Sequence, residues 1–320
     1  MKIRRSNWLS LALVAFALII VPELQAQELT LYTMPPPGHL DWSSPRSLMF
    51  DAAVANRFTF SHIKHKHTFG HVFIELRGPN GERELTGSTT APDAPSDADF
   101  ITKKGYGLGV FWADFHGALD PAEGLDAQLI DRYKSGRVGF ITFKINEAMW
   151  ARLAQYVREY RERGYGKIYA GKDKPREGLG AGCSGFGVSF LEVAGLKRPE
   201  FEKSWAVRVL IPDSMIGGPI TGKRVSLWKA VIARWAKPGE PNHLLFLYDP
   251  DLIFTWINNT WEKAKFQTVQ REVAQADHND YLAYPQFVKR GKAQGLVYDC
   301  TNYAPPAEPI WLGAAAKYVK

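Results

Sequence analysis

Short apolar segments bounded by turn residues recur along the chain, and this pattern predicts β-strands. The clearest segment spans 69–76 and carries His71. A Gly-Pro-Asn-Gly turn at 78–81 leads from it into a second predicted strand at 82–86, so the two should form a hairpin. Further strands are predicted at 29–34, 137–145 and 206–211.

Other segments repeat their apolar residues at helical spacing. After Asn146, a typical helix cap, the apolar side chains recur every three to four residues as far as Val157, and Gly164 is expected to end this helix. A second helix should begin at Cys183 and end at Gly195. Further helices are predicted at 45–55 and 226–236, and an aromatic-rich segment at 244–261 is followed by a helical pattern that runs on to about residue 276.

Strands and helices together predict an α+β fold. We expect an antiparallel sheet packed against the helix that begins at Cys183, with additional helical elements after about residue 200. The chain is 45% hydrophobic and 13% aromatic, which is ample material for a packed core. Its net charge of +7 is a mild excess, without a concentrated block of Lys and Arg among aromatic residues, so nucleic-acid binding is not expected.

The N-terminus has the pattern of a secretory signal peptide. Basic residues precede an apolar run at 8–21, and cleavage is expected after Ala26, so 1–26 is the predicted leader. The run is short for a membrane span of about 20 residues. We therefore expect a periplasmic or secreted protein with no stable membrane span once the leader is removed.

The main candidate for chemistry is Cys183, which follows a Gly-Ala-Gly run at a predicted helix start. The free N–H groups and positive dipole end of a helix favour a thiolate over a thiol. His71 on its predicted strand could take the thiol proton. His243 is a second candidate base, with a weaker local context than His71.

A third, polar group should orient the imidazole, and the predicted strand that pairs with the His71 strand offers three candidates. Glu84, Thr86 and Ser88 share one face of that strand if its alternation is regular. Simple hairpin register places Ser88 opposite His71 and Glu84 several positions away. Register alone therefore does not choose Glu84.

The residues around both candidates resemble a known group of enzymes. Residues 182–186 are similar to the cysteine motif of the NlpC-type papain-like cell-wall peptidases, and 70–72 with the following strand resemble their histidine motif. The histidine precedes the cysteine here, which resembles the circularly permuted branch that includes the lecithin:retinol acyltransferase-like proteins. The resemblance covers about 69–196 and implies a permuted papain-like cysteine hydrolase domain at 27–200, followed by a C-terminal extension or subdomain at 201–320.

The resemblance also implies roles for individual residues. It selects Glu84 as the third catalytic residue beside Cys183 and His71, and Tyr169 as a substrate-binding tyrosine. The implied activity is hydrolysis or transfer of an amide-bound or ester-bound acyl group in the cell envelope, without a cofactor. Peptidoglycan peptide is the first substrate implied and a lipid ester the second.

Two alternatives remain open at the level of sequence. An exported chain with two cysteines could form a Cys183–Cys300 disulfide and serve as a non-catalytic envelope binding domain. The chain could instead bind zinc or copper through a histidine cluster. That cluster comprises His62, His65, His67 and His71, and the lysines between its members would oppose a cation, so metal binding ranks below catalysis.

Overall fold

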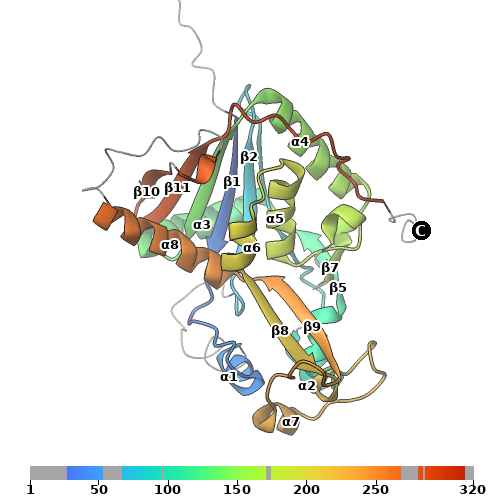
Figure 1. The fold of residues 1–320 in the computed structure, drawn as a ribbon. Helices are drawn as coiled ribbons and strands as arrows, with labels where there is room; N and C mark the ends of the chain where they lie inside the picture. The colour runs from blue at the N-terminus through green and yellow to red at the C-terminus, as the bar shows by residue number, and fades with distance from the viewer. Residues whose placement is uncertain are drawn as a thin grey trace, which may run out of the picture.

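The computed structural model describes residues 27–52, 67–95, 97–170, 174–267, 280–283 and 285–313. The fold is α+β, as the sequence pattern predicts (Figure 1). The predicted signal peptide at 1–26 lies outside the described residues. Within the described ranges, no helix combines the length and apolar character needed to cross a membrane.

A six-stranded sheet forms the centre of the molecule, with strand order β10-β11-β6-β1-β2-β3. Its strands in chain order are β1 (Gln27–Met34), β2 (His71–Arg77), β3 (Arg83–Thr86), β6 (Gly139–Ile145), β10 (Gln286–Arg290) and β11 (Ala293–Asp299). All neighbouring strands run antiparallel except β11 and β6, which run parallel. The predicted antiparallel sheet therefore has one parallel pair, made by a strand from the C-terminal part of the chain.

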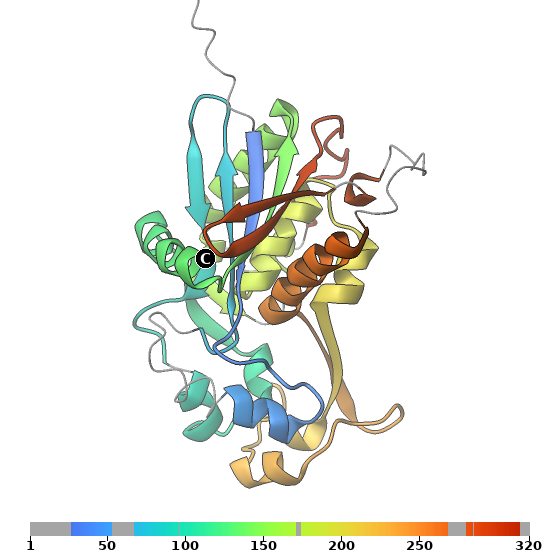
Figure 2. The same cartoon turned by 90° about the vertical axis from the view of Figure 1, so that its left-hand side faces the viewer.

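Helices cover both faces of this sheet (Figure 2). They are α3 (Ala122–Ser135), α4 (Glu147–Glu162), α5 (Cys183–Val193), α6 (Pro199–Trp205) and α8 (Pro250–Gln267). Strand β1 contributes side chains to the core on both faces. Leu29 and Leu31 belong to the core cluster that includes α4, α5 and α8, whereas Tyr32 and Met34 belong to the cluster that includes α3. Successive side chains point to opposite faces of a strand, which explains the alternation.

The remaining elements lie mainly at one end of the sheet (Figure 1). A small sheet contains β4 (Ser88–Thr90), β5 (Asp114–Leu119) and β7 (Ile168–Ala170), and a separate hairpin contains β8 (Ala206–Pro212) and β9 (Asn242–Tyr248). The short helices are α1 (Pro45–Phe50), α2 (Asp97–Thr102) and α7 (Leu227–Ile232). Single 3-10 turns occur at Leu108–Trp112, Tyr165–Lys167, Pro175–Glu177, Asp213–Met215 and Tyr281–Ala283.

Local signals placed several element ends correctly. The side chain of Asn146 accepts a hydrogen bond from the backbone N–H of Met149 at 2.9 Å, which confirms the predicted cap of α4. Gly195, at a φ of +69°, follows α5 as expected, because a left-handed residue suits glycine best. The strands predicted near 29–34, 137–145 and 206–211 correspond to β1, β6 and β8.

Other predicted elements differ from the structure. The region 88–99, whose Ser, Thr, Ala, Pro and Asp residues are typical of a loop, contains β4 and the start of α2, and the helix predicted at 226–236 is only α7. Residues 244–248 belong to β9, and α8 begins at Pro250, where proline suits the first turn of a helix. The predicted ends of the helices beyond residues 52 and 267 lie outside the described residues.

The predicted boundary at residue 200 does not divide the central sheet. Strands β10 and β11 complete the sheet, and α6 and α8 supply buried residues to its larger core cluster. Strand β11 lies between β10 and β6. The C-terminal part is therefore strand and helix integrated with the core rather than a helical addition.

Candidate active site

Cys183 is the first residue of α5 and lies against the start of β2. Gly182 is the helix N-cap, and no side chain caps the first turn, so its N–H groups remain directed toward the space before the helix. The backbone N–H of Val72 donates a hydrogen bond to the Cys183 sulfur. The Ser184 hydroxyl lies 3.9 Å from the same sulfur.

The His71 imidazole joins Cys183 to a carboxylate. Its Nε2 lies 2.9 Å from Oδ2 of Asp120, and its ring also hydrogen-bonds the Cys183 side chain. Because Nε2 faces Asp120, Nδ1 is the ring nitrogen left for the thiol. The structure thus aligns a thiol, an imidazole and a carboxylate in the order that nucleophilic catalysis requires.

The protonation of the pair favours an activated thiol. Burial acts to lower the pKa of His71, but its hydrogen bonds to Asp120 and Cys183 outweigh burial and raise that pKa to about 10. Burial acts to raise the pKa of Cys183, yet the hydrogen bond and charge of His71, with the N–H of Val72, lower it below its ordinary value. Together these shifts favour the ion pair of a thiolate and an imidazolium over the neutral thiol and imidazole.

Asp120 is held in place by the end of the neighbouring hairpin. Its backbone N–H donates to the Gly87 carbonyl at 2.8 Å, and the Thr86 hydroxyl donates to the Asp120 carbonyl at 3.1 Å. Gly87 also leaves room for the contact, since a Cβ there would lie 2.9 Å from Asp120 Oδ2 and 3.2 Å from His71 Nε2. The contact between His71 and Asp120 therefore requires glycine at position 87.

Glu84 does not lie at His71. It pairs with Leu76 in the β2–β3 register, and its carboxylate bonds Arg161 at 2.6 Å, so the selection of Glu84 needs correction. Asp120 occupies the place expected for it. The predicted register is corrected as well, because β3 ends at Thr86 and Ser88 pairs with Leu119 of β5.

The other two candidate polar residues position the loops of the site. The Ser88 hydroxyl donates to the Ala181 carbonyl at 3.0 Å, which ties the approach to Cys183 to the small sheet. The Thr86 hydroxyl holds the Asp120 backbone through its hydrogen bond to the Asp120 carbonyl. Both residues therefore act on the backbone around the triad rather than on the imidazole.

His243 and Cys300 lie away from the Cys183 thiol. His243 lies near the start of β9, whereas the residues of β9 that reach the site lie near its end. The His243 side chain bonds Asp213 at 3.0 Å. Both cysteines are free, so the structure contains no Cys183–Cys300 disulfide. Burial and the neighbouring charge of Asp299 raise the pKa of Cys300 to about 12, which leaves it protonated and unreactive at neutral pH.

The histidine cluster is only partly visible. His62 and His65 lie outside the described residues. His67 stacks on His71 with ring centroids 4.5 Å apart and bonds Gln128 at 3.0 Å. Among the residues that the structure describes, no group of three or more His, Cys, Asp or Glu side chains could hold a metal ion.

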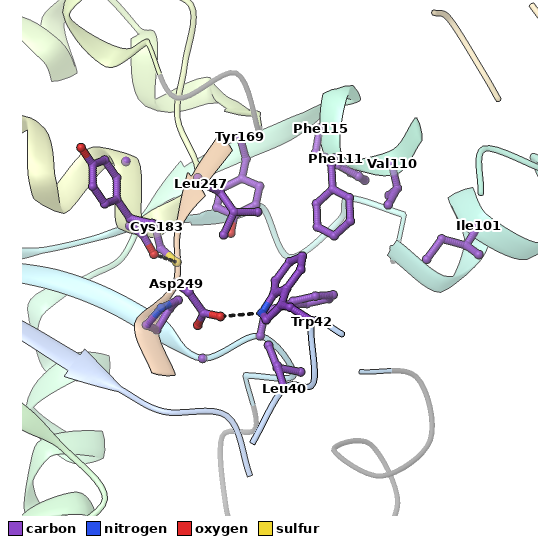
Figure 3. A pocket seen from close by; sticks show the side chains of 17 residues that line it. Leu40, Trp42, Ile101, Val110, Phe111, Phe115, Tyr169, Cys183, Leu247 and Asp249 are labelled. Atoms are coloured by element: carbon purple, nitrogen blue, oxygen red, sulfur yellow. Dashed lines mark hydrogen bonds between the residues drawn. The ribbon is translucent and has the colours of Figure 1, made fainter. Parts of the chain in front are cut away.

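A pocket of about 150 Å³ opens beside the Cys183 sulfur (Figure 3). Tyr169, for which the resemblance implies substrate binding, is one of its lining residues. Most of the remaining lining residues are apolar or glycine. They come from the chain between β1 and β2, from the region around β5 and from the junction of β9 with α8. The apolar side chains are those of Leu40, Trp42, Phe69, Ile101, Val110, Phe111, Phe115, Leu247 and Pro250. The Cys183 sulfur thus faces a largely apolar space.

Sequence reasoning missed two acidic residues of this site. Asp120 follows β5, a strand that was not predicted, and nothing in its spacing from His71 indicates the contact. Asp249 lines the pocket beside the thiol at the junction of β9 and α8. Its Asp-Pro sequence, at 249–250, was visible only as a turn signal.

Comparison with known proteins gives no family for the chain, because no family model, curated protein or solved structure matches it. The chemistry of the site therefore rests on its own geometry. Cys183, Ser184 and Gly185, the first residues of α5, line the pocket, and the N–H groups of this turn have no side-chain cap, so they could stabilise an oxyanion there. Together with the thiolate and the protonated imidazole, the arrangement can form and break an acyl–sulfur bond.

Proposed function

We propose that this protein is a thiol-dependent acyl hydrolase or acyltransferase that acts on an amide or ester. The observation that carries the proposal is the Cys183–His71–Asp120 alignment at the end of an apolar pocket. The order of His71 before Cys183 agrees with the permuted branch that the motifs resemble. The predicted leader supports a substrate in the cell envelope, where peptidoglycan peptides and lipid esters are the candidate classes.

The reaction would proceed through an acyl-enzyme. The Cys183 thiolate attacks the carbonyl carbon, and the developing oxyanion is stabilised by N–H groups at the start of α5. The His71 imidazolium then gives its proton to the departing amine or alcohol. Water, or an acceptor alcohol or amine, gives a proton back to His71 as it attacks the thioester, which releases the acyl group and restores the thiolate.

Iodoacetamide labelling and ester turnover together test this proposal. We expect Cys183 to be alkylated at mildly acidic pH while Cys300 is not, with the modified residue located by peptide mass. Aryl acetates and aryl octanoates should show a burst of one aryl alcohol per enzyme before steady turnover, because acylation precedes hydrolysis.

Two substitutions sharpen the result. Cys183→Ala should abolish the burst, and His71→Ala should slow turnover roughly 10²–10⁴-fold, as expected when a general acid–base is lost. Cys300→Ala is the matched control and should retain both labelling and turnover. A wild-type protein whose Cys183 is no more reactive than an ordinary thiol would refute the proposed activity.

A further inference from the structure

The pocket beside the thiol combines aromatic rings with one buried carboxylate. Figure 3 shows Trp42, Phe111, Phe115 and Tyr169 directed toward the space that Asp249 borders. The rings of Trp42 and Phe111 are tilted against each other at a centroid distance of 6.1 Å. The described residues that line the pocket include no lysine, arginine or histidine.

Asp249 is fixed in place but forms no direct ion pair; His39 lowers its pKa through its charge but bonds the neighbouring Asp251 instead. The Trp42 indole N–H donates to its Oδ2 at 2.7 Å, and the backbone N–H of Asp251 donates to its Oδ1 at 2.8 Å. A carboxylate can accept about four hydrogen bonds, so these two donors leave accepting capacity. Within the described part of the chain, no lysine or arginine forms an ion pair with it, although only 2% of the residue is exposed.

The energetics of Asp249 favour a positively charged partner. Burial raises its pKa to about 6, against the opposing hydrogen bonds from Asp251 and Trp42. The carboxyl is still mostly ionised at neutral pH, so its charge is held in apolar surroundings at a cost. A cation placed beside it would offset that cost, and the faces of aromatic rings attract cations as well.

We infer that the pocket binds an ammonium group of the substrate, with Asp249 as its counter-ion and the rings of Trp42 and Phe111 as cation–π partners. This inference rests on the proposed function, because Cys183 defines where the reacting carbonyl must lie. It narrows the substrate class to amides or esters whose acyl part carries a protonated amine beside an apolar group. A carboxylate at the same place would be repelled by Asp249 and by the thiolate.

Competition with iodoacetamide tests the inference on the full-length protein at pH 7.5. Benzylammonium and benzyl alcohol have the same ring and differ mainly in charge, as do octylammonium and 1-octanol. We expect each amine to protect Cys183 from alkylation at a concentration about tenfold lower than its matched alcohol. Equal protection by amine and alcohol would overturn the inference.

The same experiment separates two sources of the ammonium group. Stronger protection by benzylammonium than by octylammonium supports a compact substrate of amino-acid type. Stronger protection by octylammonium supports a long-chain amine. Either order supports an ammonium subsite, provided that the matched alcohol binds more weakly.

Asp249→Asn removes the charge and retains an oxygen that can cap α8 through the Asp251 N–H. We expect this variant to lose the tenfold preference for amine over alcohol while benzyl alcohol still protects. Asp213→Asn is the control, because Asp213 is a half-exposed carboxylate that bonds His243 away from the pocket. If the Asp249 variant preferred the amine as strongly as the wild type, the inference would be wrong.

A second variant covers the case in which Asp249→Asn does not fold, as judged by its thermal melting curve. Phe111→Leu keeps an apolar side chain but removes one ring face, and it should weaken the preference for amine about threefold. An unchanged preference in this variant, with Asp249→Asn unfolded, would count against the ammonium site.

Calorimetric titration with benzylammonium distinguishes this inference from the proposed function. If alkylation of Cys183 showed no dependence on His71, the proposed activity would fail, yet calorimetry would still measure the ammonium site through Asp249→Asn. An activated Cys183 with no difference between amine and alcohol would overturn the ammonium site alone.

Discussion

The proton shared by Cys183 and His71 shows how individual contacts decide the chemistry of this site. Burial works against both charges, because it lowers the pKa of the imidazole and raises that of the thiol. Asp120, the Val72 N–H and the mutual attraction of the pair reverse both effects. The thiolate consequently persists below the usual thiol range, and the imidazolium persists up to a pH of about 10.

These pKa directions predict different pH profiles for labelling and turnover. Alkylation of Cys183 should rise through its lowered pKa and then stay level, because a thiolate is all that it needs. Ester turnover should rise with it but fall near pH 10, where His71 loses the proton that the leaving group requires. Rates of both reactions measured from pH 4 to 11 check this, and a fall of both at the same high pH would contradict it.

Asp120→Asn should move the rising limb of both profiles to higher pH, because the charge that holds the proton on His71 is gone. Each pKa unit gained by Cys183 lowers the thiolate fraction about tenfold at pH values below its pKa. Asp93→Asn is the matched control, since it alters an exposed carboxylate that bonds His116 at 3.1 Å. Identical profiles for the two variants would argue against a positioning role for Asp120.

Site residues whose neighbours in the chain indicate their role were predicted from the sequence. Those that tertiary packing brings to the site from other segments were missed. Cys183 stands at a recognisable helix start, and His71 stands on a recognisable strand. Asp120 directly follows a strand without a clear apolar pattern, so its contact with His71 depends on tertiary packing. Glu84 had a suitable charge, but the register turns it toward Arg161.

At the scale of elements, the close approach of α5 to the sheet brings the thiol to the imidazole. A Cβ at Gly187 would lie 2.6 Å from Cγ1 of Val72 and 2.8 Å from Cδ1 of Leu31. The helix therefore packs on β1 and β2 at a distance that only glycine allows at this position. Helix caps and turn residues were predictable because they act locally, but this packing distance involves side chains far apart in the sequence.

Gly187→Ala should separate the helix from the sheet and weaken the contact between Cys183 and His71. We expect a loss of roughly 1–3 kcal/mol in the free energy of unfolding, the usual cost of overpacking a core. Alkylation of Cys183 at pH 6 should also slow. Both are measured on one sample, by denaturant unfolding and by labelling.

Gly124→Ala is the matched control for this change. It also places alanine in a helix, but the nearest atom to the new Cβ, at 3.8 Å, is Cγ of Pro121. It should leave labelling unchanged and stabilise the protein by roughly 0.5–1 kcal/mol. A Gly187 variant as stable and reactive as this control would refute the packing argument.

At the scale of the whole molecule, distant parts of the chain complete one sheet. Strand β11 lies between β10 and β6, and its parallel pairing with β6 joins residues more than 140 positions apart, such as Leu296 and Ile141. The sequence does not indicate this pairing, because pairing is set by tertiary packing, and so the predicted boundary at residue 200 was drawn through a continuous core.

This continuity predicts that a defect in β11 destabilises the distant active site. A Cβ at Gly295 would lie 2.0 Å from Cε2 of Phe140, so Gly295→Ala should cost roughly 1–3 kcal/mol. In a domain of this size that loss lowers the melting temperature by about 2–4 °C for each kcal/mol. Circular dichroism reports the whole fold during heating, and loss of rapid Cys183 labelling reports the site.

The two signals should change together in the wild type and shift together in the variant, because the site and β11 share one core. Gly124→Ala again provides the control and should not lower either midpoint. If Cys183 kept its reactivity after the circular dichroism signal of the variant had begun to fall, residues 27–200 would hold the site without β11. Coincident transitions would instead mean that the C-terminal strands are needed to keep the thiol and imidazole in contact.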